Sequence, residues 1–347
     1  MAVKKSGHRP TPEELRARVA ALNEAAERLR FTRVEKARAL AAEAYRLARI
    51  IGDRTGAADA QTRLANCHLH RGKYLEALVN CRKALVELGP LSDKRRTARI
   101  LRMAGNVYTL TGQYRKALAQ YRRSLELSWR DDPDNALNIH NNLGTVHTYL
   151  GEPASARAHY AQALELARAA KNRGHESLVL MNLGNLHKQA GDLKTAANYL
   201  GGSLKIRRAL GDAIGQAEAL CNLGELESRA GRPARALPLL RASLKLSAAA
   251  DDDRTRLYTL INLAEAEGLT RDEKTALAHA DEALALARKQ GDSRAALSAR
   301  LVRGRLLIAA KRAPEARREL AAVISRASAL GENPLAAEAR AALEKIQ

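Results

Sequence analysis

Apolar residues recur along most of the chain at spacings of three and four, the period of one face of an α-helix. Between residues 77 and 88, for example, the face consists of Ala77, Cys81, Ala84, Leu85 and Leu88, with charged and polar residues between them. Gly, Asp or Pro interrupts this pattern at short intervals. We therefore expect a succession of short amphipathic helices.

The apolar pattern itself repeats with a period of forty residues. The tripeptide Asn-Leu-Gly, or a close variant, begins at Asn142, Asn182, Asn222 and Asn262. Self-similarity at a fixed period of this length is the signature of stacked supersecondary units. The sequence thus predicts a chain of helical hairpins.

Two small residues mark every hairpin, one before the turn and one after it. Small residues at facing positions let two helices pack at a short interaxial distance. We interpret Gly201-Gly202, inside a helical pattern, as a further close-packing point. The residues before the turn are Ala25, Ala65, Gly105, Gly144, Gly184, Gly224, Ala264 and Gly304, and those after it are Ala37, Ala77, Ala117, Ala156, Ala196, Ala236, Ala276 and Ala316.

Glycines and aspartates predict the ends of the helices. Gly52-Asp53, Gly211-Asp212 and Gly291-Asp292 place a helix-ending Gly before an Asp that can cap the next helix. Other glycines follow the first helix of a hairpin, where a left-handed cap residue is favoured. These are Gly72, Gly112, Gly151, Gly191 and Gly231.

These signals divide the chain into a basic tail at 1–11, eight hairpins over 12–332 and a capping helix at 333–347 that begins at Asn333-Pro334. The predicted hairpins are 12–52, 53–91, 92–131, 132–171, 172–211, 212–251, 252–291 and 292–332. The predicted helices are 12–30, 33–51, 54–71, 74–88, 93–111, 114–129, 133–150, 153–171, 173–190, 193–210, 212–230, 233–250, 252–269, 272–290, 292–311, 314–330 and 333–346.

The repeated residues resemble the tetratricopeptide repeat family over nearly the whole chain after residue 12. The forty-residue period with its Asn-Leu-Gly and Gly-Asp signatures is most similar to the Pins/LGN-type polarity adaptors and the kinesin light chains. The chain departs from the family pattern in lacking the Trp of the first helix and in carrying His68, His147 and His187 at the Tyr position. The resemblance implies an all-α, right-handed α-solenoid whose first helices line an inner groove that binds other proteins.

Composition adds limits on location and chemistry. Hydrophobic residues at 46% and charged residues at 28% are typical of a folded protein, and aromatics at only 3% require a core of small aliphatic side chains. No segment approaches the roughly 18 to 20 apolar residues of a membrane span. Cys67, Cys81 and Cys221 lack the spacing of a disulfide framework or a zinc site. We expect a cytoplasmic protein without cofactor or metal, and the Ala- and Arg-rich usage suggests a bacterial source.

The net charge of +21 lies mainly in the first third of the chain. Residues 1–130 contain 28 Lys and Arg against 12 Asp and Glu, whereas residues 131–347 contain 31 against 26. Nucleic acid or another polyanion could bind this third and the tail residues Lys4, Lys5, His8 and Arg9. The shortage of aromatics for base stacking weighs against this alternative.

Polar residues of the first helices are the candidate binding site. Asn side chains can pair with the backbone of a bound peptide, and Arg can bind its carboxylates or phosphates in a bidentate manner. Glu in later repeats would favour basic or polar partner residues there. The predicted groove residues are Arg63, Asn66, Arg99, Arg102, Asn106, Asn138, Asn142, Asn182, Asn185, Lys188, Asn222, Glu225, Asn262 and Glu265.

Structural explanations for the same residues stay open. The Asn residues before Leu-Gly could satisfy polar groups between repeats. The cluster Lys94, Arg95, Arg96, Arg99 and Arg102 could be only a solvated helix face, and the three His at the Tyr position are expected in the core or at interfaces.

The leading functional hypothesis is an adaptor that binds an extended or helical segment of a partner protein. No P-loop, GxGxxG, HExxH or GxSxG motif is present, so we do not expect an enzyme. The alternatives are the polyanion binder and a peptide-sensing regulator, and a homodimer through terminal repeats is compatible with the sequence.

Overall fold

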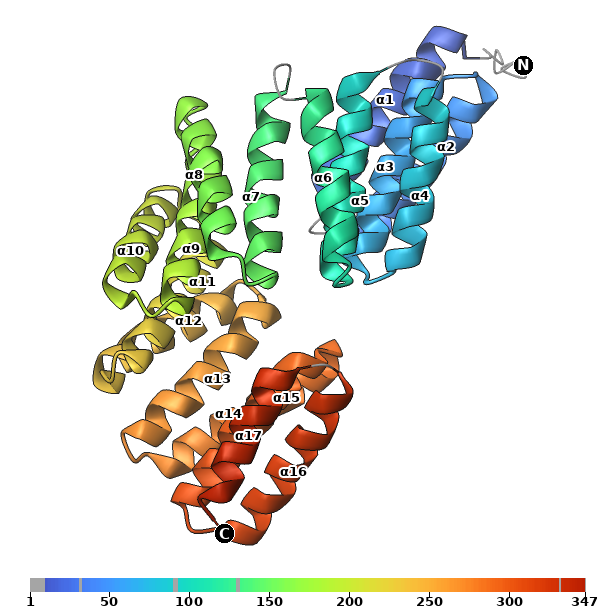
Figure 1. Ribbon diagram of the computed structural model, residues 1–347. Helices are drawn as coiled ribbons and strands as arrows, with labels where there is room; N and C mark the ends of the chain where they lie inside the picture. Colours follow the sequence, from blue (N-terminus) through green and yellow to red (C-terminus); the bar gives the residue numbers. More distant parts are fainter. Residues whose placement is uncertain (1–9, 31–32, 90–92, 129–131, 331, 347) are drawn as a thin grey trace, which may run out of the picture. The chain divides into compact units, whose positions relative to one another are not determined.

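The computed structural model describes residues 10–30, 33–89, 93–128, 132–330 and 332–346. These residues form seventeen α-helices and no strand (Figure 1). The chain divides into two compact units, residues 1–170 and 171–347, which we call the N-terminal and C-terminal units. The predicted tail at 1–11 lies largely outside the described residues.

The N-terminal unit contains four hairpins. Its helices are α1 (Pro12–Leu29), α2 (Val34–Ile50), α3 (Arg54–His70), α4 (Tyr74–Leu88), α5 (Lys94–Leu110), α6 (Tyr114–Ser128), α7 (Pro133–Tyr149) and α8 (Pro153–Ala169).

The C-terminal unit contains four hairpins and a final helix. Its helices are α9 (Arg173–Gln189), α10 (Leu193–Ala209), α11 (Ala213–Arg229), α12 (Pro233–Ala249), α13 (Asp253–Leu269), α14 (Glu273–Gln290), α15 (Ser293–Ala309), α16 (Ala313–Ala329) and α17 (Asn333–Glu344).

Consecutive helices pack in pairs, as the repeat predicts. The observed helix ends agree with the predicted ends to within two residues, and α17 packs against α15 and α16. Within each unit the first helices of successive hairpins also contact one another, whereas the second helices of successive hairpins do not. The all-α solenoid with a C-terminal helix is confirmed, and the first helices form the tighter side of each stack.

The small residues in the hairpins explain how closely the helices approach. A Cβ atom built on Gly184 of α9 would lie 2.7 Å from Cγ of Leu200 on α10, closer than carbon atoms pack. The prediction for Gly201 is wrong, because a Cβ atom there meets nothing within 4 Å. Gly202 is different, with Cδ1 of Leu180 at an ordinary 3.6 Å. Gly201 is half-buried and has room for a methyl group.

The Gly-Asp signature ends one hairpin and begins the next. Gly211 has a φ of 66°, and the Asp212 carboxylate accepts a hydrogen bond from the Gly215 N–H at 2.9 Å. Gly52-Asp53 and Gly291-Asp292 repeat this arrangement. The turn glycines Gly72, Gly112, Gly151, Gly191 and Gly231 also have positive φ, as predicted.

A buried hydroxyl links three of the second helices to the first helix of their own hairpin. Ser203 Oγ donates to the Ser177 carbonyl at 2.8 Å, and Ser243 Oγ donates to the Ala217 carbonyl at 2.7 Å. Ser124 Oγ donates to the Ala98 carbonyl in the same way. Each bond gives a buried serine hydroxyl a hydrogen-bond partner at the contact between the two helices of a hairpin.

The predicted core cysteines and histidines are largely enclosed. All three cysteines are buried and free, and burial raises the pKa of each thiol, that of Cys81 to about 12. His147 is buried, whereas His68 and His187 are half-buried. No helix in the described part of the chain is long and apolar enough to span a membrane.

Candidate functional site

The first helices of the N-terminal unit bring the predicted Asn and Arg residues onto neighbouring elements. Helix α3 contacts α5, and α5 contacts α7, so polar groups of successive repeats can reach one another. The small residues at the turn hold these helices at fixed distances from their partners. The side chains of this face are therefore positioned by the hairpin frame.

An amide pair connects α5 to α7. Asn106 Oδ1 accepts hydrogen bonds from Asn142 Nδ2 and from the hydroxyl of Tyr121, both at 2.8 Å. Burial raises the pKa of Tyr121 to about 12. Its hydroxyl also lies 3.1 Å from Thr109 Oγ1. The two Asn side chains are thus partly structural and have a fixed orientation.

Two arginines share one buried carboxylate at the start of α7. Asp132 Oδ2 accepts from Arg95 Nε at 3.2 Å and from Arg99 Nε at 2.8 Å, and the Asp132 side chain is 1% exposed. Burial raises the pKa of Asp132, but hydrogen bonds and charge from Arg99, together with the hydrogen bond from Arg95, outweigh it and hold the pKa below its usual value. One negative charge therefore faces two positive ones.

Arg102 is hydrogen-bonded to an amide, where Arg95 and Arg99 bind a carboxylate. Its Nε donates to Asn135 Oδ1 at 2.7 Å, and burial lowers the pKa of its guanidinium. Among the described residues, no carboxylate lies within ion-pair distance of Arg102. Arg95, Arg99 and Arg102 together carry a charge of about +2 in excess of Asp132.

Not all of the predicted cations are available to a ligand. Arg63 Nη1 lies 2.7 Å from Glu27 Oε2, and Arg30 binds the same carboxylate. Arg96, in the basic cluster, pairs with Asp59 at 3.0 Å and with Asp93 at 2.7 Å. The basic cluster is therefore tied to neighbouring helices and is more than a solvated face.

The predicted groove residues of the C-terminal unit bind one another. Lys188 is buried, and its Nζ lies 3.0 Å from Asn222 Oδ1 and 2.6 Å from Glu225 Oε2. Glu225 also pairs with Arg229 at 3.0 Å. Lys188 therefore links α9 to α11 of the next repeat, and its part in ligand binding stays a prediction.

Other residues of the C-terminal unit are similarly engaged or enclosed. Asn262 Nδ2 donates to Cys221 Sγ at 3.3 Å, and Asn185 Oδ1 is buried without a partner in the described structure. Glu265 lies 3.8 Å from Arg305, and burial raises the pKa of its carboxyl. The remaining predicted residues Asn66, Asn138 and Asn182 are half-buried on α3, α7 and α9.

Sequence reasoning missed the partners that set the charge of the site. Asp132 and Asn135 are part of a helix cap, in which Asp132 accepts from the Asn135 N–H, yet both also bind arginines of the preceding repeat. The signal was the Asp that precedes most of the first helices. Whether such an Asp also binds an arginine depends on the side chain that the preceding repeat places beside it. In the described part of the chain, no group of three or more His, Cys, Asp or Glu residues could hold a metal ion.

A family model described as tetratricopeptide repeat matches residues 56–128, 135–209, 177–249 and 215–289. The chain belongs to the tetratricopeptide repeat family. This result confirms the resemblance at the level of the family, and the Pins/LGN or kinesin-light-chain subclass stays a prediction. The comparison with curated proteins finds no match.

Solved structures support the same tetratricopeptide fold. The Rap protein complexed with Competence and Sporulation Factor has a TM-score of 0.64 and 15% identity, with 97% of this chain and 98% of that one covered. Aspartyl phosphate phosphatase F from Bacillus subtilis has a TM-score of 0.64 and 14% identity, with 92% and 94% covered. A signal transduction ATPase with a tetratricopeptide repeat sensor from Pyrococcus horikoshii has a TM-score of 0.67 and 14% identity, with 99% and 50% covered.

Proposed function

We propose that this tetratricopeptide repeat protein is a non-enzymatic interaction scaffold whose N-terminal unit binds an acidic segment of a partner protein. The observation that carries the proposal is Arg102, a half-buried cation that is hydrogen-bonded to Asn135 and has no carboxylate within ion-pair distance among the described residues. Taking a cation out of water is costly unless it is paired. An acidic ligand side chain would supply the missing charge.

The surroundings of Arg102 support a ligand that carries more than one carboxylate. Arg95 and Arg99 share the single charge of Asp132, so a second anion close to them would also be stabilised. A guanidinium binds a carboxylate in a bidentate manner with charge-assisted hydrogen bonds of about 1.5–3 kcal/mol. We therefore favour a segment rich in Asp or Glu over a neutral peptide.

The Asn pair would hold the backbone of the same segment. Asn106 and Asn142 are oriented by their mutual hydrogen bond and by Tyr121, so they lose little conformational freedom when a ligand binds. An amide side chain has more donor and acceptor sites than this pair uses internally. This part of the interaction would be tolerant of sequence, whereas the arginines would select for acidity.

We assign the C-terminal unit a smaller part in binding the acidic segment. Lys188, Asn222 and Glu225 satisfy one another, so a ligand would have to break existing bonds to use them. The regulator alternative remains, because a Rap protein of the same fold is crystallised with Competence and Sporulation Factor. In that case the acidic segment would be a small peptide signal.

Fluorescence anisotropy with labelled synthetic peptides tests the proposal. We expect an Asp- and Glu-rich peptide to bind and a peptide with Lys at the same positions not to bind. Arg102→Gln should weaken binding roughly tenfold, about 1.4 kcal/mol, because it removes the cation with which the ligand carboxylate would pair. Arg123→Gln, at an exposed position of α6, is the matched control and should leave the affinity unchanged.

Equal affinity of the acidic and basic peptides would contradict the proposal. The same holds if Arg102→Gln and Arg123→Gln have equal effects, since the loss would then reflect net charge alone.

A further inference from the structure

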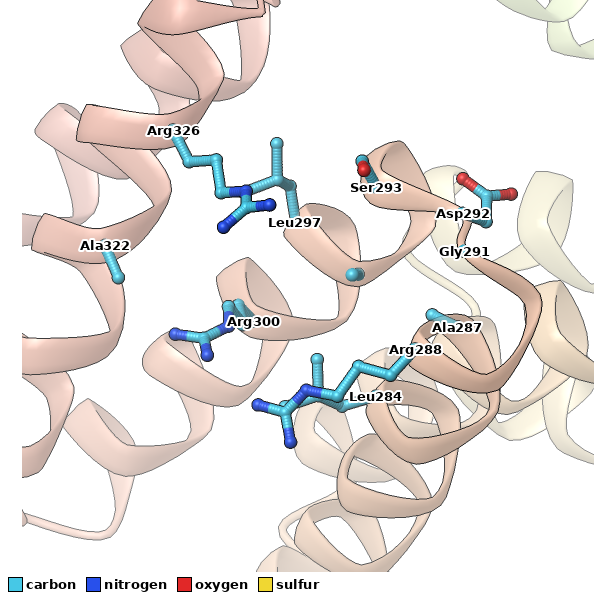
Figure 2. Close-up of a pocket in the computed structure, with 11 residues that line it drawn as sticks. Leu284, Ala287, Arg288, Gly291, Asp292, Ser293, Leu297, Arg300, Ala322 and Arg326 are labelled. Carbon is cyan, nitrogen blue, oxygen red and sulfur yellow. The ribbon is translucent and has the colours of Figure 1, made fainter.

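The C-terminal unit contains a cavity that is separate from the predicted groove residues. It lies between α14, α15 and α16 and has a volume of about 390 Å³. Figure 2 shows Arg288, Arg300 and Arg326 extending from these three helices into the space between them. Apolar side chains, including Leu284 and Leu297, form much of the remaining lining. Three cations therefore meet beside an apolar surface.

Two of these arginines replace apolar residues of the repeat. Arg300 stands four residues before the small residue Gly304, and the same position in the three preceding hairpins is Leu180, Leu220 and Leu260, all buried. Arg326 stands ten residues after Ala316, where the preceding hairpins have Ile206, Leu246 and Leu286. Both positions are therefore charged in this hairpin, whereas they are apolar in the three hairpins before it.

The helices around α3 repeat this arrangement, with the opposite charge at one position. Arg49, Gln61 and Glu87 occupy the places that Arg288, Arg300 and Arg326 occupy around α15. Arg49 Nη1 donates to Glu87 Oε1 at 3.0 Å, and the Glu87 side chain is 8% exposed. A carboxylate is thus the group that this site holds when it is complete within the chain.

The cavity in the C-terminal unit lacks that internal carboxylate. In the described structure no carboxylate lies within 4 Å of the Arg288 or Arg326 guanidinium, and Arg300 lies 3.4 Å from Glu319, which Arg303 also binds at 2.7 Å. The other acid at the cavity, Asp292, caps α15 through the Ala295 N–H. Positive charge remains in excess.

We propose that this cavity binds a small carboxylate with an apolar body. The carboxylate would lie between Arg288 and Arg326 and would bind Arg288 as the Glu87 carboxylate binds Arg49. The apolar body would pack against Leu284, Leu297 and Ala322. The volume falls at the small end of ligand pockets, which measure roughly 300–1,000 Å³. The site is independent of the acidic segment assigned to the N-terminal unit.

Isothermal titration calorimetry of the full chain with octanoate, octanamide and inorganic phosphate tests this site. We expect octanoate to bind at one site, octanamide to bind at least tenfold more weakly because it lacks the charge, and phosphate to bind more weakly than octanoate because it lacks the apolar body. Arg326→Glu should abolish octanoate binding, since the new carboxylate would pair with Arg288 as Glu87 pairs with Arg49. Arg318→Glu, at an exposed position of the same helix, makes the same charge change away from the cavity and should leave binding unchanged.

Arg326→Leu restores the residue type of the preceding hairpins and is expected to fold with an unchanged or higher melting temperature, while octanoate binding falls at least tenfold. The proposal is overturned if octanoate does not bind, if phosphate or octanamide binds as tightly as octanoate, or if Arg326→Leu binds like the parent protein. It is also overturned if Arg318→Glu loses affinity as much as Arg326→Glu.

Discussion

At the scale of single residues, the absence of one methyl group, the Cβ of Gly184, lets the two helices of a hairpin pack closely. Gly184 and Gly201 lie in the same hairpin, on α9 and α10, and both are inside helices. Their surroundings differ, because a Cβ atom on Gly184 would overlap Leu200 whereas a Cβ atom on Gly201 would meet open space. Substituting Ala at Gly201 therefore tests helix propensity alone, whereas the same substitution at Gly184 tests helix propensity together with packing.

Gly201→Ala should stabilise the protein by about 0.5–1 kcal/mol, because Ala is the better helix former. Gly184→Ala should destabilise it by roughly 1–2 kcal/mol, since the overlap with Leu200 outweighs the same gain in propensity. Urea unfolding followed by circular dichroism measures both changes. Equal effects of the two substitutions would mean that the facing small residues do not set the distance between the helices.

At the scale of helices, a cluster of imidazoles joins the two helices of the fourth hairpin. His140 and His147 lie on α7 and His159 on α8, with 3.1 Å between Nδ1 of His140 and Nδ1 of His159. The rings of His147 and His159 stack at 5.3 Å, and His147 Nδ1 lies 2.6 Å from Glu152. Burial, followed by the charges of His140, His147 and Arg122, lowers the pKa of His159 to about 4.

This cluster predicts a loss of stability in mild acid. Between pH 6.5 and 4 the unfolded chain protonates His159 while the folded chain keeps it neutral, so the free energy of unfolding falls as the pH falls. Because solvent reaches part of the ring, we expect a loss on the order of 1–2 kcal/mol. Urea unfolding over this pH range measures it.

His159→Gln should reduce this pH dependence, whereas His187→Gln, in the C-terminal unit, should leave it in place. If both variants keep the full slope, the acid sensitivity arises from groups outside the cluster.

The helices and their ends were predictable because they depend on local signals. Apolar periodicity, the turn glycines and the Asp caps each act within a few residues, so the seventeen helices were placed to within two residues. The charge state of the site was less predictable, because it depends on contacts between repeats. Nothing near Lys188 in the sequence indicates that it will form an ion pair with Glu225 of the next repeat. Likewise, nothing near Arg102 indicates that its hydrogen-bond partner will be the amide of Asn135 instead of a carboxylate.

At the scale of the whole molecule, the net charge of +21 overstates how much positive charge is free. Many arginines are bound to carboxylates of neighbouring helices, as Arg96 is to Asp59 and Asp93. Nonspecific attraction to a polyanion depends on unpaired surface charge and is screened by salt. The division into two units, which the regular repeat did not predict, falls between the fourth and fifth hairpins.

We therefore expect a labelled single-stranded oligonucleotide to bind at low salt and to lose roughly 100-fold or more in affinity by about 0.15 M salt. The acidic peptide should lose less than about tenfold, because its partner Arg102 is half-buried and less screened. Anisotropy titrations at two salt concentrations compare the two ligands. Tight oligonucleotide binding at physiological salt would favour the polyanion alternative.

The three buried thiols also make the protein convenient to label. A thiol reacts as its thiolate, and burial both blocks access to Cys67, Cys81 and Cys221 and raises their pKa. A maleimide dye should thus modify a single cysteine introduced on the surface far faster than the native ones. Pairs of such dyes, one in each unit, would report the distance between the units in solution without removal of any native cysteine.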